Sequence, residues 1–175
     1  ELIERIEKVS NAYFDLGVRK GDIVTILMPN TPESVISIYA LNRLGAVSNI
    51  VHPLSAQEEI KNYLNSVESK FLLTIDLCCR KVTAILDETS VQKVIVASAG
   101  ETMPAFMKFA YSLTNKNKNS FPHEDSRYIT WKGFMKQAHS RVKEYKPTGA
   151  ENEEVAIILH SGGTTGTPKD IMLSN

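Results

Sequence analysis

Residues 155–169 read VAIILHSGGTTGTPK, and this stretch does most to decide the fold class. The apolar run 155–159 is typical of a buried strand. Residues 161–167 hold three glycines and four hydroxyl side chains, and Lys169 follows shortly after. Glycines let backbone N–H groups approach an anion closely, hydroxyls add donors, and a lysine adds a mobile positive charge. This combination predicts a loop that binds a polyphosphate.

The spacing within the loop excludes the two commonest nucleotide loops. A Walker loop needs a Gly-Lys pair, whereas Lys169 lies three residues beyond Gly166. A dinucleotide fingerprint needs G-x-G-x-x-G at the first strand-to-helix turn, whereas Gly162 and Gly163 are adjacent and lie late in the chain. An ordinary Gly/Thr-rich turn between two strands remains the structural alternative. Lys169 after Pro168, with a strand before the loop, favours phosphate binding over that turn.

Upstream of the loop, helical and strand patterns alternate along the chain. Apolar residues at helical spacing predict helices over 2–16, 32–44, 56–67 and 76–88, and from 131 to 138. Short apolar runs between them predict strands over 23–28, 46–51, 71–75, 93–97 and 155–159. This alternation predicts an α/β fold of βαβ units, with a mainly parallel sheet flanked by helices and right-handed crossovers.

Several helix ends carry recognisable signals. Thr31 is a predicted N-cap with a proline at the first helical position. Ser55, with Glu58 three residues later, predicts a capping box for the next helix. Gly45 predicts a helix end. The alternation breaks over 99–127, where we expect a short helix at 103–113 and a polar, mobile loop at 114–125.

Composition narrows the functional classes. At 175 residues with 42% hydrophobic and 23% charged residues, the chain is typical of one soluble globular domain. Twenty basic and twenty acidic residues cancel, so nothing favours nucleic acid. No apolar run is long enough for a membrane span, and no secretory signal is present, so we expect a cytoplasmic protein. Adjacent Cys78 and Cys79 predict buried, reduced thiols, and the four histidines show no metal spacing.

Three stretches together resemble one known family. The order SGGTTGTPK over Ser161–Lys169 resembles the phosphate loop of the adenylate-forming (AMP-binding) superfamily, which includes acyl-CoA synthetases, peptide-synthetase adenylation domains and beetle luciferases. Residues 16–33, LGVRKGDIVTILMPNTPE, resemble an early segment of that family, and 44–47 with 52–54 resemble a second. The resemblance runs over 2–175 and is weakest over 99–127. Asp170 stands where the family nearly always has glycine.

The resemblance implies a place in a larger enzyme. It is closest to the N-terminal part of an acyl-CoA synthetase, so residues 1–175 are expected to be a single partial domain, with the rest of the large domain and a small lid domain outside it. The implied activity is an AMP-forming acid–thiol ligase that activates a carboxylic acid, expected to be a fatty acid. The implied small molecules are ATP, Mg²⁺ and coenzyme A. Catalytic residues are expected beyond Asn175, so the chain alone is expected to be inactive.

The resemblance also assigns roles within the loop. It implies that ATP phosphates are bound by Ser161, Gly162, Gly163, Thr164, Thr165, Gly166, Thr167, Pro168 and Lys169. His160 is expected either to face the substrate pocket or to pack at the strand end, and no metal ligand is expected within the chain.

Other readings of the chain stay open at this point. A peptide-synthetase adenylation domain is the alternative within the family. A non-catalytic nucleotide-binding module is the alternative that Asp170 favours, because its carboxylate would repel phosphates. An unrelated α/β protein with a chance loop is the third. Exposed strand edges make a homodimer of the chain a further expectation.

Overall fold

The computed structural model describes residues 1–98, 122, 124–139, 154–161 and 169–174. Its centre is a seven-stranded sheet in the order β5-β4-β3-β1-β2-β6-β7. The neighbouring strands pair in parallel, except that β7 runs antiparallel to β6. The predicted α/β fold with a mainly parallel sheet is therefore confirmed. The strands span Ile23–Leu27 (β1), Val47–Val51 (β2), Phe71–Ile75 (β3), Lys93–Ala97 (β4), Tyr128–Thr130 (β5), Val155–Ser161 (β6) and Lys169–Ser174 (β7).

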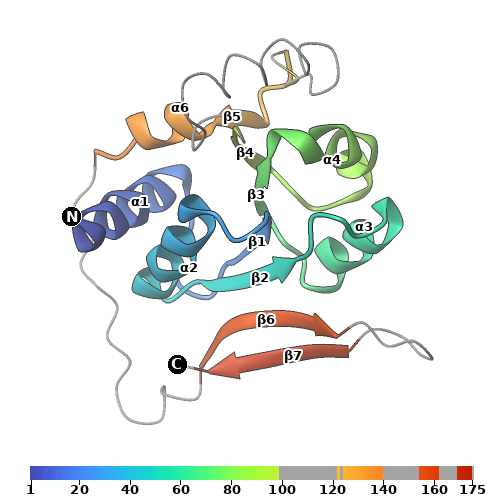
Figure 1. Cartoon of the computed structure of the whole chain (residues 1–175), viewed down its shortest axis with the longest axis horizontal. Coiled ribbons are helices and arrows are strands. Elements are labelled where there is room, and N and C mark those ends of the chain that lie inside the picture. The colour runs from blue at the N-terminus through green and yellow to red at the C-terminus, as the bar shows by residue number, and fades with distance from the viewer. Residues whose placement is uncertain (99–121, 123, 140–153, 162–168, 175) are drawn as a thin grey trace.

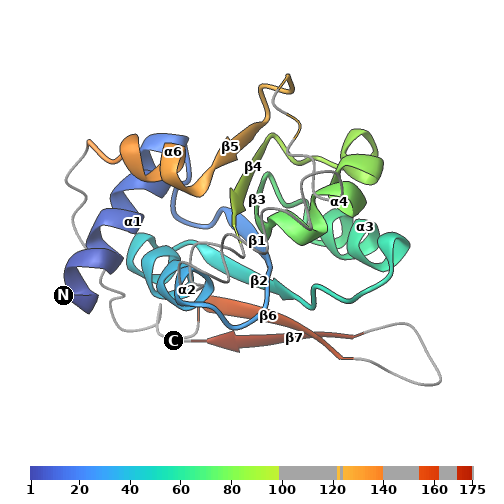
Figure 2. The ribbon, with the colours of Figure 1, turned by 45° about the horizontal axis from the view of Figure 1, so that its top comes forward.

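Helices cover both faces of the sheet. On one face α1 (Leu2–Leu16) packs against α2 (Pro32–Leu44) and α6 (Trp131–Lys136), and on the other α3 (Gln57–Ser66) packs against α4 (Cys79–Ile85). Figures 1 and 2 show the two groups on opposite sides of β1 and β3. The connection after β1 therefore runs to one face and the connection after β2 to the other, which is the arrangement that opens a crevice at the carboxyl ends of a parallel sheet.

The structure corrects several element predictions. In place of one helix over 76–88, the structure has the shorter helix α4 with a 3₁₀ turn at each end, Asp76–Cys78 and Leu86–Glu88. The last predicted helix ends at Lys136 rather than Ala138. Strands β5 and β7 were not predicted, because β5 has three residues and β7 follows the loop with no clear alternation. The predicted helix at 103–113 and most of the loop at 114–125 lie outside the described residues.

The two predicted N-caps have different outcomes. Thr31 caps α2 as predicted: its Oγ1 accepts from the Ser34 N–H at 3.4 Å, and Ser34 Oγ accepts from the Thr31 N–H at 3.0 Å. The box predicted at Ser55 is wrong by one residue, because the N-cap of α3 is Ala56. The Ser55 N–H donates instead to the His52 carbonyl at 3.0 Å, which places Ser55 in the turn before the helix. The carboxylate of Glu59, rather than that of Glu58, accepts from the Ala56 N–H at 2.9 Å.

These caps make a matched pair of stability predictions. Thr31→Ala is expected to lower the free energy of unfolding by about 1 kcal/mol, because it removes a side-chain acceptor from the first turn of α2. Ala56→Ser is expected to raise it by about 0.5–1 kcal/mol, because Ala56 is exposed and supplies no such acceptor. Urea denaturation of both variants checks the signs. A shift in the same direction for both would contradict the cap assignment.

The core fills the space between the sheet and the two helical layers. All five residues of β3 are buried, and the adjacent strands β1 and β4 are buried except at their first residues. A cluster of aromatic rings joins α6 to α1: the Phe134 side chain is fully buried, and its ring centroid lies 4.8 Å from that of Tyr13 and 5.3 Å from that of Trp131. This cluster packs α6 against α1.

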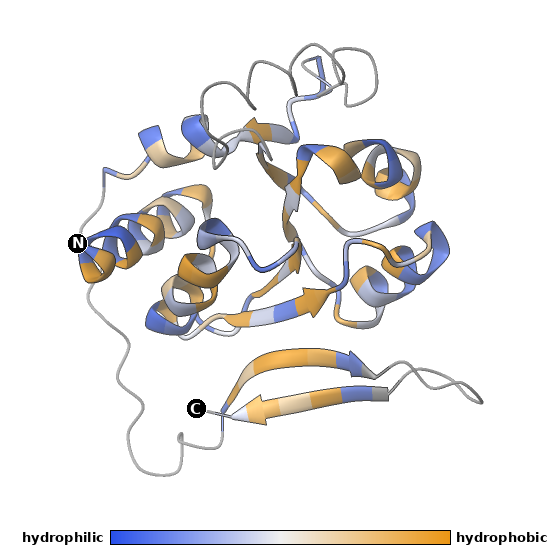
Figure 3. Ribbon diagram, viewed as in Figure 1, coloured by the Kyte–Doolittle hydropathy of each residue, from blue (hydrophilic) through white to orange (hydrophobic). Residues whose placement is uncertain are grey.

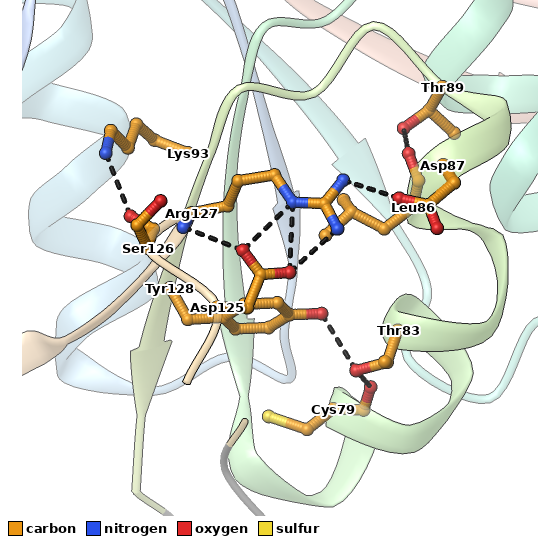
Figure 4. Close-up of polar contacts among 10 residues, drawn as sticks. All are labelled: Cys79, Thr83, Leu86, Asp87, Thr89, Lys93, Asp125, Ser126, Arg127 and Tyr128. Carbon is orange, nitrogen blue, oxygen red and sulfur yellow. Dashed lines mark hydrogen bonds and ion pairs between the residues drawn. The ribbon is translucent and has the colours of Figure 1, made fainter. Parts of the chain in front are cut away.

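Polar contacts attach the segment before β5 to the opposite helical layer (Figure 4). Arg127 binds Asp125 through Nε at 3.1 and 3.0 Å and through Nη2 at 2.7 Å, and its Nη1 reaches Asp87 at 2.8 Å. Hydrogen bonds from Arg127 lower the pKa of the Asp125 carboxyl. The hydroxyls of Tyr128 and Thr83 lie 2.9 Å apart, which adds a contact between β5 and α4. These contacts position the far edge of the sheet, away from the loop at 161–169.

Candidate functional site

The two ends of the predicted phosphate loop are held opposite each other by a strand pair. β6 ends at Ser161, β7 begins at Lys169, and these two residues are register partners. Figure 1 shows β6 and β7 side by side at one edge of the sheet. The remaining predicted phosphate-binding residues lie outside the described part of the chain: Gly162, Gly163, Thr164, Thr165, Gly166, Thr167 and Pro168. A turn between two strands was the structural alternative for this loop, so its strand context alone does not separate the two interpretations.

The strand ends that lead into the loop lie at the crevice of the sheet. β6 pairs in parallel with β2, so Ser161 lies at the same end of the sheet as the ends of β1 and β2. A cavity of about 690 Å³ opens there, lined by residues that follow β1 and β2 and by residues of α3, β6 and β7. Both β6 and β7 are hydrophobic over most of their length and hydrophilic where they approach the loop (Figure 3). Sequence reasoning predicted the loop but missed this cavity, because the residues that line it come from segments far apart in the sequence.

His160, the last residue before the loop, has partners on every side. Its Nδ1 lies 2.8 Å from Asp170 Oδ1, and its Nε2 lies 2.7 Å from Asn49 Oδ1. The imidazole also stacks on the Tyr63 ring, with centroids 3.9 Å apart and planes 17° apart. Only 4% of the His160 side chain is exposed. His160 lines the cavity and also packs at the strand end, so its position does not decide between the two expected roles.

Asp170 adopts an ordinary strand conformation. It lies in β7, and Glu68 is the only non-glycine residue with positive φ in the part of the chain that the structure describes. The backbone at this position therefore does not require glycine. The Asp170 carboxylate contacts His160 and helps to raise the pKa of Tyr63, after the larger effect of burial and that of Glu59. Sequence reasoning noted Asp170 but could not identify His160 as its partner.

A second, more apolar hollow adjoins the cavity. It has a volume of about 460 Å³, shares Pro29, His52 and Pro53 with the first, and extends to Leu54, Leu77 and Cys78. Lys81 borders it, and its ammonium donates to the carbonyls of Pro53 and Ser55 at 3.4 and 3.0 Å. These bonds fix the turn that follows β2 at the mouth of the crevice.

The two cysteines beside this hollow are buried thiols. Burial, with smaller contributions from Asp76 and Cys78, raises the pKa of Cys79 to about 12. Burial also raises the pKa of Cys78. Because the thiolate is the reactive form, we expect neither residue to react with a disulfide reagent at pH 8 in the folded protein. Both are expected to react once the protein is unfolded in urea, which titration with a chromogenic disulfide can follow. Rapid reaction of the native protein would contradict this prediction.

Comparison with known proteins identifies the family. The model of the family described as "AMP-binding enzyme" matches residues 1–175. The chain belongs to this family. The match covers all three stretches on which the sequence resemblance rests.

Relatives in the family include enzymes acting on different acids. The chain is 28% identical to the long-chain-fatty-acid–CoA ligase of Bacillus subtilis, over 91% of the chain and 28% of that protein. It is 29% identical to acetyl-coenzyme A synthetase 1 of Saccharomyces cerevisiae, over 99% of the chain and 23% of that protein. The crystal structure of a long-chain-fatty-acid-CoA ligase from Archaeoglobus fulgidus superposes with a TM-score of 0.72 at 25% identity, over 99% of the chain and 29% of that structure. The chain thus spans about a quarter of the length of these relatives.

Among the described residues, no group of three or more His, Cys, Asp or Glu side chains is placed to hold a metal ion. No helix in the described ranges has both the length and the apolar character needed to cross a membrane.

Proposed function

We propose that the full-length protein is an AMP-forming acyl-CoA ligase and that residues 161–169 of this chain hold the β- and γ-phosphates of ATP. The observation that carries the proposal is the position of the sequence SGGTTGTPK: it joins the paired ends of β6 and β7, next to the cavity at the carboxyl ends of β1 and β2. Ligands of parallel α/β sheets bind at such a crevice. Membership of the AMP-binding enzyme family supports the same site.

The reaction has two steps. In the first, a carboxylate oxygen of the acid attacks the α-phosphorus of ATP, the bond from that phosphorus to the bridging oxygen breaks, and pyrophosphate leaves. In the second, the thiol of coenzyme A attacks the acyl carbon, loses its proton, and displaces AMP. Negative charge builds on the pyrophosphate during the first step, so donors already aimed at it lower the barrier. We assign that work to the backbone N–H groups and hydroxyls of the loop and to the Lys169 ammonium.

Three parts of the proposal go beyond membership of the family: the acid, the metal ion and the location of the enzyme and its catalytic groups. We propose a fatty acid as the substrate, supported by the fatty-acid ligase among the relatives and by the apolar lining of the second hollow. Mg²⁺ is proposed to arrive with ATP, and none of the described residues is assigned to it. We propose a cytoplasmic enzyme whose adenine-binding and catalytic groups lie outside residues 1–175, so that this chain alone is inactive.

Self-association of the isolated chain is also proposed. β7 forms one edge of the sheet and exposes Ile171, Met172 and Leu173 by 46%, 64% and 43%. An apolar edge strand is a template for pairing with a second copy. Sedimentation of residues 1–175 as a monomer at all concentrations would remove this part of the proposal.

ATP–pyrophosphate exchange by the full-length protein tests the function. The assay is run with acetate, medium- and long-chain fatty acids, aryl acids and amino acids as separate substrates. Exchange that depends on fatty acids supports the proposal, and exchange that depends on acetate keeps the ligase but corrects the acid. Exchange with amino acids would favour a peptide-synthetase adenylation domain. A folded protein with no exchange for any acid would overturn the proposal in favour of a non-catalytic module.

A further inference from the structure

A continuous row of hydrogen-bonded side chains runs from β7 through β6 and β2 to β1 and ends just before β3. It begins at Asp170 on β7 and passes through His160 on β6, as described above. Asn49 on β2 then donates through Nδ2 to Thr25 Oγ1 on β1 at 3.0 Å, and Thr25 Oγ1 donates to Ser69 Oγ at 2.9 Å. Ser69 lies just before β3 and donates to the Phe71 carbonyl at 3.0 Å. The row thus joins the base of the loop to the centre of the sheet.

The inner part of the row is rigid. The side chains of Asn49, Thr25 and Ser69 are fully buried, and each has its polar atoms paired with a neighbour in the row or with the backbone. A buried polar group that loses its partner is costly, so a fully paired buried network holds one arrangement. Asp170 is the outer end, with 35% of its side chain exposed.

The hydrogen bonds fix the orientation of the His160 ring. Asn49 donates through its amide nitrogen to Thr25, so its oxygen faces His160 Nε2 and accepts from it. His160 Nδ1 faces a carboxylate oxygen of Asp170. Stacking on Tyr63 then fixes the ring plane.

We propose that His160 and Asp170 are positioning residues that hold the base of the phosphate loop in the orientation that binds ATP. They are register partners directly next to the Ser161–Lys169 pair, so the side-chain contact lies where both strands pass into the loop. The contacts from Asp170 through His160 to Asn49 fix the backbone next to Lys169, the first residue of β7. The inference rests on the proposed function, and it gives Asp170 a role opposite to the repulsive one that the sequence suggested.

Asp170→Gly in the full-length protein separates these two roles. Positioning predicts that this variant and Asp170→Ala raise KM for ATP about tenfold in the exchange assay, because a loop displaced by a fraction of an ångström binds phosphates less well. KM for the acid is expected to stay within about twofold, since no residue of the row lines the second, apolar hollow that is proposed to take the acid. Repulsion by Asp170 predicts the reverse, a lower KM for ATP. Asp170→Asn, which keeps an oxygen acceptor for His160, is expected to retain most of the affinity.

Controls distinguish positioning from a general loss of stability. Met172→Ala shortens a side chain on the same face of β7 that takes no part in the row, and it should leave KM for ATP unchanged. His160→Asn and the double variant His160→Asn/Asp170→Ala should each match Asp170→Ala, because residues that act as a unit are not additive. An additive double variant, or a parallel rise in KM for ATP and for the acid, would overturn the inference.

A second measurement does not depend on activity. Amide hydrogen exchange at residues 160, 161, 169 and 170 should be about tenfold faster in Asp170→Ala than in the parent protein without any nucleotide, while amides of β1 and β2 are unchanged. Unchanged exchange at all four would overturn the positioning role whatever the enzyme does. If the parent protein shows no pyrophosphate exchange but Asp170→Ala still speeds amide exchange at these residues, the proposed function is overturned and the structural role of the pair is kept.

Discussion

Lys169→Ala is expected to lower the rate of ATP–pyrophosphate exchange by the full-length protein by about 10²–10³-fold, because removing one preorganised charge or donor from a developing anion has an effect of this size. Lys169 follows the glycine- and hydroxyl-rich segment and is the register partner of Ser161, so its backbone is fixed at the start of β7. Steady-state exchange, with ATP and pyrophosphate varied separately, measures the effect.

Two further variants make the result specific to this position. Lys169→Arg keeps the charge and should recover part of the rate. Lys132→Ala removes an exposed lysine on α6, at the far side of the sheet, and should have no effect on exchange. Equal rates for Lys169→Ala and the parent protein would refute the assignment of the phosphate site to this loop.

Phe134→Ala is expected to lower the free energy of unfolding by about 3–5 kcal/mol, as is usual for removing a buried phenyl ring. The Phe134 side chain is fully buried and makes an edge-on contact with Tyr13 of α1, so its loss leaves a cavity between α6 and α1. Urea denaturation followed by tryptophan fluorescence is suitable, since Trp131, the only tryptophan, adjoins the same ring.

The loss of unfolding free energy in Phe134→Ala is expected because the ring is buried, and a variant at an exposed ring checks this reason. Tyr39→Ala removes an aromatic ring of α2 that is 58% exposed, and it should change stability by no more than about 0.5 kcal/mol. Phe134→Leu should cost less than Phe134→Ala because it refills part of the space. Similar losses for Tyr39→Ala and Phe134→Ala would show that the ring cluster does not anchor α6.

Local signals in the sequence were sufficient for most of the central fold. Periodicity and caps predicted β1 to β4, α1 and α2 to within a residue or two, because these elements have strong apolar patterns and α1, α2, β1 and β2 also have glycine or proline near their ends. The single-residue error at Ser55 arose because two capping boxes were possible one residue apart. Glu58 has the spacing for a helix that starts after Ser55, and Glu59 has it for one that starts after Ala56. Only the fold of the preceding turn, where Ser55 bonds to His52, decides between them.

Long-range relations were beyond sequence reasoning. The strand β5 is short, and its place beside β4 depends on contacts such as that of Arg127 with Asp87. His160 and Asp170 were each noted in the sequence, but their contact depends on the hairpin register, and Asn49 comes from a strand more than a hundred residues earlier. The predicted phosphate-binding residues over 162–168 stay a prediction.

The sheet order has a consequence for biosynthesis. β2 is complete at Val51, but the strand that covers its outer edge, β6, begins at Val155. About 100 residues must be made between them, which takes roughly 5–20 s at ordinary rates of translation. During that interval the nascent chain can assemble β1, β2, β3 and β4 while one side of β2 has no neighbour. We expect the ribosome-bound intermediate to expose this edge of β2, and slowing translation upstream of β6 should lengthen its exposure to misfolding.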